Sequence, residues 1–151
     1  MTELLSPAGG REALVAAVQN GADAVYMGFG AFNARRSARN FSDEEFRAAV
    51  SYCHLRGVKV YLTLNTLVTD RELPALAAEA RTASECGVDA ILVQDWGVLA
   101  TLQKIIPDVP LHASTQMSIH SLEGVMEAAA LGCSRVVLAR ELPAEEIAHI
   151  C

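Results

Sequence analysis

Gly21-Ala-Asp-Ala-Val-Tyr-Met-Gly28 is the stretch that decides the fold, because three later stretches repeat its pattern. They are Gly57-Val-Lys-Val-Tyr-Leu-Thr-Leu64, Gly87-Val-Asp-Ala-Ile-Leu-Val-Gln94 and Gly132-Cys-Ser-Arg-Val-Val-Leu-Ala139. In each stretch a glycine suited to the C′ position of a helix comes before a short apolar run. Apolar runs without alternation indicate strands that are buried on both faces, as in a parallel sheet covered by helices.

Between these runs the apolar residues follow the spacing of an amphipathic helix. Three sets share the i, i+3, i+4, i+7 pattern: Phe46, Ala49, Val50 and Cys53; Leu73, Leu76, Ala77 and Ala80; and Leu122, Val125, Met126 and Ala129. Capping boxes at Ser42–Glu45 and Thr69–Glu72 predict where two of the helices begin. Pro143 is expected in the first turn of a last helix, where proline is tolerated.

Two weaker strands, Glu3–Leu5 and Pro110–His112, complete six strand–helix units in one domain, 1–151. The repeat of roughly 25 to 30 residues is typical of barrels, and a full eight-unit barrel takes about 250 residues. The fold class is therefore α/β: a TIM-type (β/α) barrel with six of eight repeats, incomplete or a fragment. A doubly wound sheet is disfavoured, because no helix follows Gly28-Phe-Gly30 closely enough for a phosphate-binding fingerprint. Two unpaired sheet edges are expected, and they suggest self-association.

The composition indicates a globular protein rather than a disordered or membrane-spanning one. The chain has 52% hydrophobic and 20% charged residues, and no apolar run approaches the roughly 18 residues that span a bilayer. No secretory signal is visible, so a cytoplasmic location and no membrane partner are expected. The net charge of −6 disfavours a broad surface for nucleic acid. The four cysteines match no zinc spacing, so no metal is assigned.

The candidate site lies where the strands end, because the reactive groups of such barrels gather at the carboxyl ends of the strands. Side chains that can ionise or hydrogen-bond follow nearly every strand, and this convergence favours a binding site. The predicted substrate-binding residues are Asn33, Arg35, Asn65, Gln94 and Asp95, and the predicted catalytic residues are His112, Ser114, Gln116, Arg140 and Glu141.

Several of these residues allow two interpretations. His112 is either a proton carrier or a buried histidine beneath the rim. Asp95 is either a general base or the N-cap of the next helix, and the cap is favoured. Arg140 and Glu141 either act on the substrate or pair with each other. A further cluster, made of Arg35, Arg36 and Arg39, either binds phosphate or carboxylate or is a solvated loop.

The rim motifs resemble the collagenase-like peptidase family U32. The similarity rests on LLSPAGG (4–10), NGADAVYMG (20–28), FNAR (32–35), NTLV (65–68), VQDWG (93–97), HASTQMSIHS (112–121) and LARELP (138–143). It covers the whole chain in the family's order, and the pair HASTQM and LAREL is its most specific part. The resemblance implies the same ten site residues that follow from the strand ends.

What the resemblance implies for function is open between two reactions. The family was named for hydrolysis of collagen, so the first hypothesis is a peptidase-like hydrolase. Other members resemble oxygen-independent hydroxylases that act on tRNA or rRNA bases or on a quinone precursor, and these bind an iron–sulfur cluster through cysteines beyond the matched stretch. The cofactor expectation is therefore none within this chain and a possible cluster in the full-length protein. The expected partner is a peptide, an RNA or a small-molecule substrate; a non-catalytic binding barrel is the third hypothesis.

Overall fold

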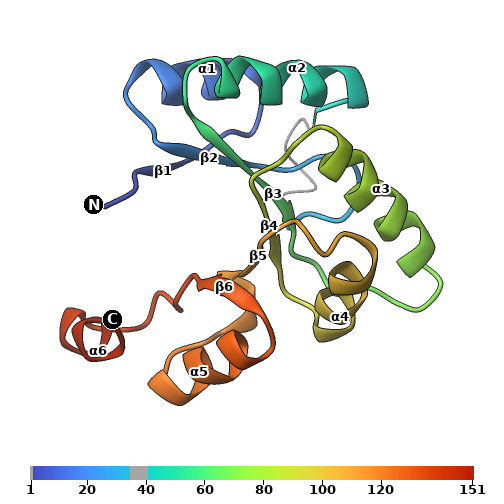
Figure 1. Cartoon of the computed structure of the whole chain (residues 1–151). Helices are drawn as coiled ribbons and strands as arrows, with labels where there is room; N and C mark the ends of the chain where they lie inside the picture. The colour runs from blue at the N-terminus through green and yellow to red at the C-terminus, as the bar shows by residue number, and fades with distance from the viewer. Residues whose placement is uncertain (1, 35–40) are drawn as a thin grey trace.

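The computed structural model describes residues 2–34 and 41–151, and it is an open α/β barrel (Figure 1). Its six strands are all parallel and pair in chain order, β1 to β6. The elements are β1 (Leu5–Pro7), α1 (Arg11–Gln19), β2 (Ala24–Met27), α2 (Asp43–His54), β3 (Lys59–Leu64), α3 (Leu73–Glu85), β4 (Ala90–Val93), α4 (Trp96–Ile105), β5 (Leu111–Ala113), the 3₁₀ turn η1 (Thr115–Met117), α5 (Leu122–Ala130), β6 (Cys133–Val136) and α6 (Ala144–Ile150). The predicted fold class, with six strand–helix repeats, is confirmed.

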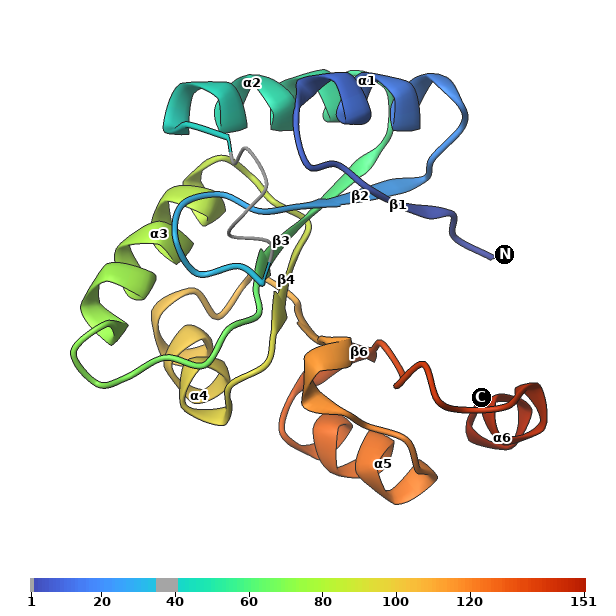
Figure 2. The same ribbon diagram turned by 180° about the vertical axis from the view of Figure 1, so that it is seen from behind.

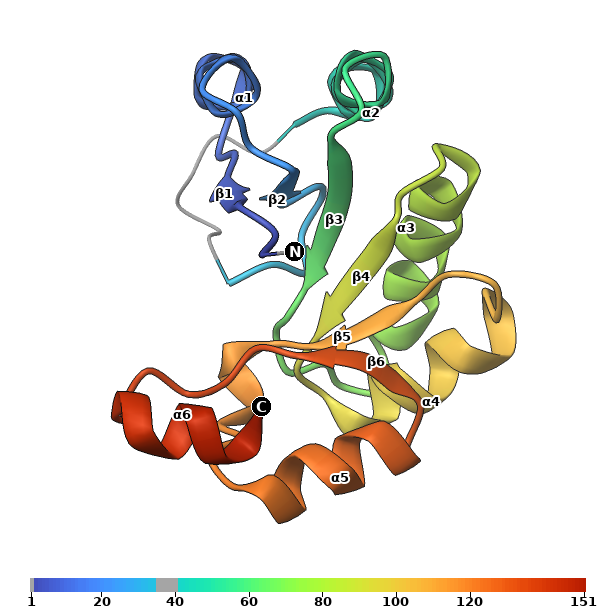
Figure 3. The same ribbon diagram turned by 60° about the vertical axis from the view of Figure 1, so that its left-hand side comes forward.

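The sheet curls into an arc, and helices α1 to α5 cover its outer side (Figure 3). The view from behind shows the same order of helices around the strands (Figure 2). Among the described residues, β1 pairs only with β2 and β6 only with β5, so each leaves one edge without a strand. Association through these edges stays a prediction.

Alternation along each strand divides the buried residues into two layers. Residues such as Val60, Leu62 and Leu64 of β3 face the helices and belong to the large outer core. Tyr61, between them, faces the barrel interior, where it packs with Ala24, Ala90 and Leu92. The interior layer positions the site, because the next residues along the same face reach the rim.

The glycines that decide the repeat all adopt left-handed backbone conformations. Gly21, Gly57, Gly87 and Gly132 have φ angles of 85°, 70°, 83° and 91°. A side chain strains this conformation, which explains why glycine marks the turn from each helix into the next strand.

Most of the predicted element boundaries are correct, and one helix start is wrong. Ser42 and Glu45 form the expected capping box of α2. At the start of α3 the Thr69 hydroxyl donates to Glu72 instead of accepting, and the helix begins only at Leu73. The two weak strands begin slightly later than predicted, at Leu5 and Leu111. No helix among the described residues is long and apolar enough to cross a membrane.

Candidate functional site

A cavity of about 390 Å³ opens at the carboxyl ends of the strands. Its walls come from residues of β1 to β4 and from the segments that follow β1, β2, β3, β5 and β6. The lining residues are Leu5, Ala8, Gly9, Tyr26, Met27, Gly28, Ala34, Thr63, Asn65, Leu92, Ser114, Thr115, Gln116, Val137 and Arg140. Aliphatic and aromatic walls with a few polar groups are typical of a small-molecule or cofactor site. We call this space the rim cavity.

Asn65 connects three of the loops around the rim cavity. Its Oδ1 accepts from the backbone N–H of Ala34 at 3.0 Å, in the loop after β2. Its Nδ2 donates to the Ser114 hydroxyl at 3.3 Å, after β5. Ser114 is 2% exposed and also accepts from the backbone N–H of Gln116 at 3.4 Å, which caps η1. Asn65 therefore holds the rim together as well as facing the cavity.

Arg140 is the cation of the rim cavity, and no carboxylate lines this space among the described residues. Arg140 and Glu141 are both exposed. The ion pairs found among residues 2–34 and 41–151 do not join these two side chains or give Arg140 another partner. The possible Arg140–Glu141 pair therefore does not form, and the guanidinium is free to bind an anionic group.

His112 lies beneath the rim cavity rather than on its wall. It is 6% exposed, and its ring meets Tyr61 edge to face with 4.9 Å between centroids. Burial, and next the positive charge of Arg135, lower the pKa of His112 to about 4. The imidazole is therefore neutral at pH 7, as expected for a buried histidine of the barrel interior. Its catalytic role stays a prediction.

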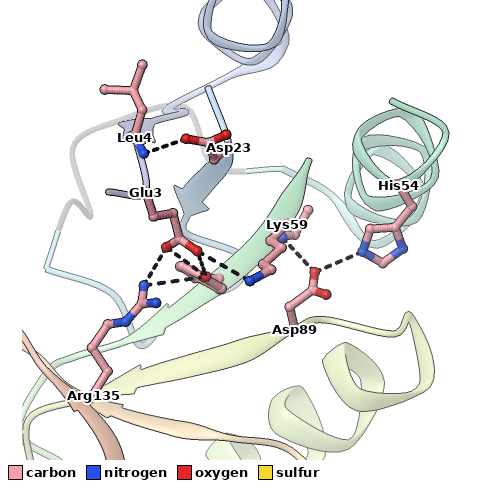
Figure 4. A network of polar contacts seen from close by, with 9 residues as sticks. Glu3, Leu4, Asp23, His54, Lys59, Asp89 and Arg135 are labelled. Carbon is pink, nitrogen blue, oxygen red and sulfur yellow. Dashed lines mark hydrogen bonds and ion pairs between the residues drawn. The ribbon is translucent and has the colours of Figure 1, made fainter. Parts of the chain in front are cut away.

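At the opposite, amino-terminal end of the barrel, Glu3 is the centre of a polar network (Figure 4). Its carboxylate accepts from Arg135, from Lys59 at 3.3 Å and from the Tyr61 hydroxyl at 2.9 Å. The bond from Arg135 is the largest cause that lowers the pKa of Glu3 to about 2. This network joins the segment before β1 to β6 across the interior.

The same end carries bonds from carboxylates to the backbone of neighbouring strands (Figure 4). Asp23 accepts from the N–H of Leu4 and Asp89 from the N–H of Val60, both at 2.7 Å. Each aspartate stands two residues after a turn glycine, so the repeat itself places it beside the preceding strand. These groups are paired with protein partners, which indicates a structural role.

The other predicted site residues that the structure describes lie outside the lining of the rim cavity. Asn33 is 1% exposed, and its Nδ2 donates to the Gly30 carbonyl at 3.4 Å. Asp95 caps α4 by accepting from the N–H of Val98 at 2.9 Å, as favoured above, and Gln94 beside it is half-buried. Arg35, Arg36 and Arg39 lie outside the described residues. Of the predicted set, Asn65, Ser114, Gln116 and Arg140 share the cavity.

The sequence analysis missed several groups that shape the rim. Tyr26 and Thr63 line the cavity from inside strands rather than from strand ends. Alternation could have identified Thr63, because it shares the interior face of β3 with Tyr61. Glu79, on α3, accepts from the backbone N–H of Ala31 at 3.2 Å. Nothing in the helical spacing distinguishes Glu79 from a surface glutamate.

Other cavities among the described residues include one near the amino-terminal end of α1 and one between α1 and α2. The first, of about 520 Å³, is lined by Gly9 to Ala13, Phe41 and Glu45, and the second, of about 120 Å³, is mainly apolar. Neither gathers side chains from several strand ends, so the rim cavity is the better candidate.

The described residues hold no cluster suited to a metal. No three His, Cys, Asp or Glu side chains within residues 2–34 and 41–151 come together as a metal site. All four cysteines are free thiols, and burial raises the pKa of Cys53 to about 11. The cysteines of this chain therefore do not fit an iron–sulfur cluster.

The motifs at the rim and the barrel agree with a match to a family model. The model described as Peptidase family U32 matches residues 9–151. This chain belongs to peptidase family U32. A solved U32 peptidase, Mk0906, has the same fold, with a TM-score of 0.77 and 18% identity over 99% of this chain and 64% of its own.

Relatives with different names match the U32 chain over almost its full length. It is 41% identical to a 23S rRNA 5-hydroxycytidine synthase of Escherichia coli, covering 98% of this chain and 22% of that protein. It is 37% identical to tRNA hydroxylation protein P1 of Bacillus subtilis, covering 96% of this chain and 34% of that protein. It is 34% identical to a collagenase of Porphyromonas gingivalis, covering 98% of this chain and 35% of that protein. The chain thus spans about a third or less of the length of these relatives.

Proposed function

We propose that this chain forms the substrate-binding rim of an enzyme that hydroxylates a pyrimidine base in RNA. The single observation that supports this most is the lining of the rim cavity, where the described residues combine amides, hydroxyls and the Arg140 guanidinium without a carboxylate. Amides and hydroxyls suit the hydrogen-bonding edge of a neutral base. A guanidinium suits the phosphate attached to the base.

The size and walls of the rim cavity support the same substrate class. A volume of about 390 Å³ lies in the range of small-molecule sites. The walls include the aliphatic side chains of Met27 and Leu92, and such apolar surfaces suit the faces of a planar ring, as in other proteins that take a base out of its stack. The similarity to proteins named for rRNA and tRNA hydroxylation points in the same direction.

The acidic charge of the chain limits how it would contact RNA. A net charge of −6 opposes binding along the phosphate backbone over a broad surface. The proposal therefore assigns to this chain the recognition of one flipped nucleotide and assigns the wider RNA contacts to other parts of the complete protein. A redox cofactor would also be held outside this chain, because its cysteines do not fit a cluster.

Peptide hydrolysis is the second candidate, favoured by the buried Ser114 hydroxyl at the cavity and by the relative named a collagenase. Ser114 accepts from Asn65 and from the Gln116 N–H, and neither of these groups is a general base. Among the described residues no His–Ser hydrogen bond activates it. This candidate therefore needs a base from outside the described residues.

The test compares RNA from cells that lack their own base hydroxylases, with and without the gene for the complete protein. Mass spectrometry of the digested nucleosides is expected to show a pyrimidine nucleoside that has gained one oxygen atom. Unchanged nucleosides, together with cleavage of a peptide library that is lost in Ser114→Ala, would replace this proposal by the second candidate.

A further inference from the structure

Glu79 stands apart from the other acidic side chains because a helix on the outer layer brings its carboxylate against a loop of the rim. One oxygen, Oε2, accepts from the backbone N–H of Ala31 at 3.2 Å. The other, Oε1, is buried, and no donor among the described residues reaches it. A carboxylate in such surroundings lacks the solvation it has in water, which is unfavourable for a surface helix without a specific reason.

The loop beside Glu79 is shaped to receive the carboxylate. Gly30 has a φ angle of 63°, a left-handed conformation that disfavours any side chain. A Cβ at Gly30 would also collide with the Glu79 carboxylate. The close approach therefore depends on a glycine at this position, which ties α3 to the loop after β2.

The same loop reaches the rim cavity a few residues later. Asn33 is buried against Gly28, and a Cβ at Gly28 would lie 2.6 Å from its side chain. Ala34 lines the cavity, and its N–H is held by Asn65. Two side chains from different elements, Glu79 at Ala31 and Asn65 at Ala34, thus hold the segment 28–34 from opposite sides.

We propose that Glu79 is a positioning residue of the site: by accepting from Ala31, its carboxylate fixes the segment 28–34 so that Ala34 and Asn65 form one wall of the rim cavity. Glu79 does not line the cavity, so it acts through the loop. The proposal rests on the proposed function only in taking the rim cavity as the place where substrate binds.

The charge state of Glu79 gives this role a measurable signature. Burial is the largest cause that raises its pKa to about 7, the Ala31 N–H opposes this shift, and the charge of Asp43 at the start of α2 adds to it. Residues 28–34 carry no ionisable side chain. Because the closed loop raises this pKa above its usual 4.5, ionisation is less favourable in the closed loop than in an open, solvated one. Glu79 therefore holds the loop more firmly near pH 5 than above pH 7.

The test is hydrogen exchange of the peptide covering residues 28–34 in the complete protein, read by mass spectrometry. Glu79→Ala is expected to speed exchange in this peptide about ten-fold, the size expected for loss of a charge-assisted hydrogen bond. Glu85→Ala is the matched control, since Glu85 lies on the same helix but pairs with Arg47 at 3.8 Å on the surface. Glu85→Ala is expected to leave the exchange rate of this peptide unchanged.

A pH series separates positioning from a general effect on folding. After correction for the intrinsic exchange rate, protection of residues 28–34 in the unaltered protein should fall as the pH rises from 5 to 7, because the closed loop holds the Glu79 proton more tightly than an open loop does. In Glu79→Gln, which keeps an acceptor without a charge, protection should not change over this range. Equal exchange in Glu79→Ala and Glu85→Ala, or a fall that persists in Glu79→Gln, would overturn the proposal.

The readout does not need enzymatic activity, so the two proposals can fail separately. A protein that modifies no RNA but loosens at residues 28–34 in Glu79→Ala contradicts the proposed function alone. If RNA modification is present, Glu79→Ala should raise KM several-fold with little change in kcat, because the wall of the cavity is displaced.

Discussion

The two ends of the barrel differ in what their polar groups contact. At the amino-terminal end, Glu3 is bound by Arg135, Lys59 and Tyr61, and Asp23 and Asp89 are bound to strand N–H groups. At the rim, Arg140 has no carboxylate partner among the described residues and faces a cavity. Polar groups that are paired stabilise the fold, whereas those left available can bind a ligand. The comparison separates a structural end from a functional one, as in other barrels of this type.

One pair of residues makes this comparison within a single segment. Arg135 lies on β6 and contributes to the network at the amino-terminal end, while Arg140 lies five positions later, at the rim. They have the same side chain and differ in their surroundings. Replacing each in turn tests the difference between the ends directly.

The largest effect is expected from Arg135→Ala. It removes the strongest partner of Glu3, so the free energy of unfolding should fall by about 2.5 kcal/mol. This is less than for a fully buried pair, because both side chains are partly exposed and solvent screens their interaction. Urea unfolding followed by circular dichroism measures this. A loss below about 1 kcal/mol would mean that Lys59 and solvent replace Arg135, and the amino-terminal end would not be the stabilising one.

Arg140→Ala should do the reverse of Arg135→Ala: it should leave stability almost unchanged and weaken the proposed reaction. Because Arg140 is exposed and has no ion-pair partner in the described structure, stability should change by less than about 0.5 kcal/mol. In the proposed RNA reaction, kcat/KM should fall about 30-fold, which corresponds to one charge-assisted bond to phosphate. Arg81→Ala, on the exposed side of α3, is the control for loss of a positive charge. Equal losses in both variants would remove Arg140 from the site.

The sequence contained enough information for the fold because its signals are local. Glycines such as Gly21 and Gly87 end helices, and the apolar runs after them form buried strands. The bond between Glu3 and Arg135 joins residues 132 positions apart, and no local pattern predicts it. The start of α3 was also wrong, because Thr69 and Glu72 form only half of a capping box: Glu72 accepts from the Thr69 backbone N–H as expected, but the Thr69 hydroxyl donates to Glu72 instead of accepting from its N–H.

The site was predicted less completely. The end of a strand shows at which end of the barrel a side chain lies, but not whether that side chain lines the cavity or is buried beneath it. His112 lies on β5 and Ser114 directly after it, and only Ser114 lines the rim cavity. Thr63 was missed because it lies before the strand end, although it faces the same interior. Glu79 was missed because its partner is a backbone N–H in a loop. Such contacts depend on packing between elements that the chain pattern does not reveal.

His112 lies between the two ends of the barrel, so its titration tests whether it belongs to the buried interior or to the rim. Its pKa of about 4 lies below the usual 6.5, so the unfolded chain takes up a proton first as the pH falls. Stability present above pH 6.5 is therefore lost as the pH drops toward 4, by about 1.8 kcal/mol between pH 7 and 5. His112→Gln should lack this loss when unfolding is measured at both pH values. Equal pH dependence in the two proteins would show that His112 is hydrated and able to carry protons.

The smallest effect is expected at Asp95, which lies at the rim yet has a structural partner. Its carboxylate caps α4 through the N–H of Val98, so Asp95→Ala should cost about 1 kcal/mol in the free energy of unfolding. Asp70→Ala, an exposed turn residue, is the control and should change stability by less than about 0.5 kcal/mol. Thermal unfolding distinguishes the two. If Asp95→Ala kept full stability but lost activity, Asp95 would act on the substrate. The functional end would then extend beyond the rim cavity to the start of α4.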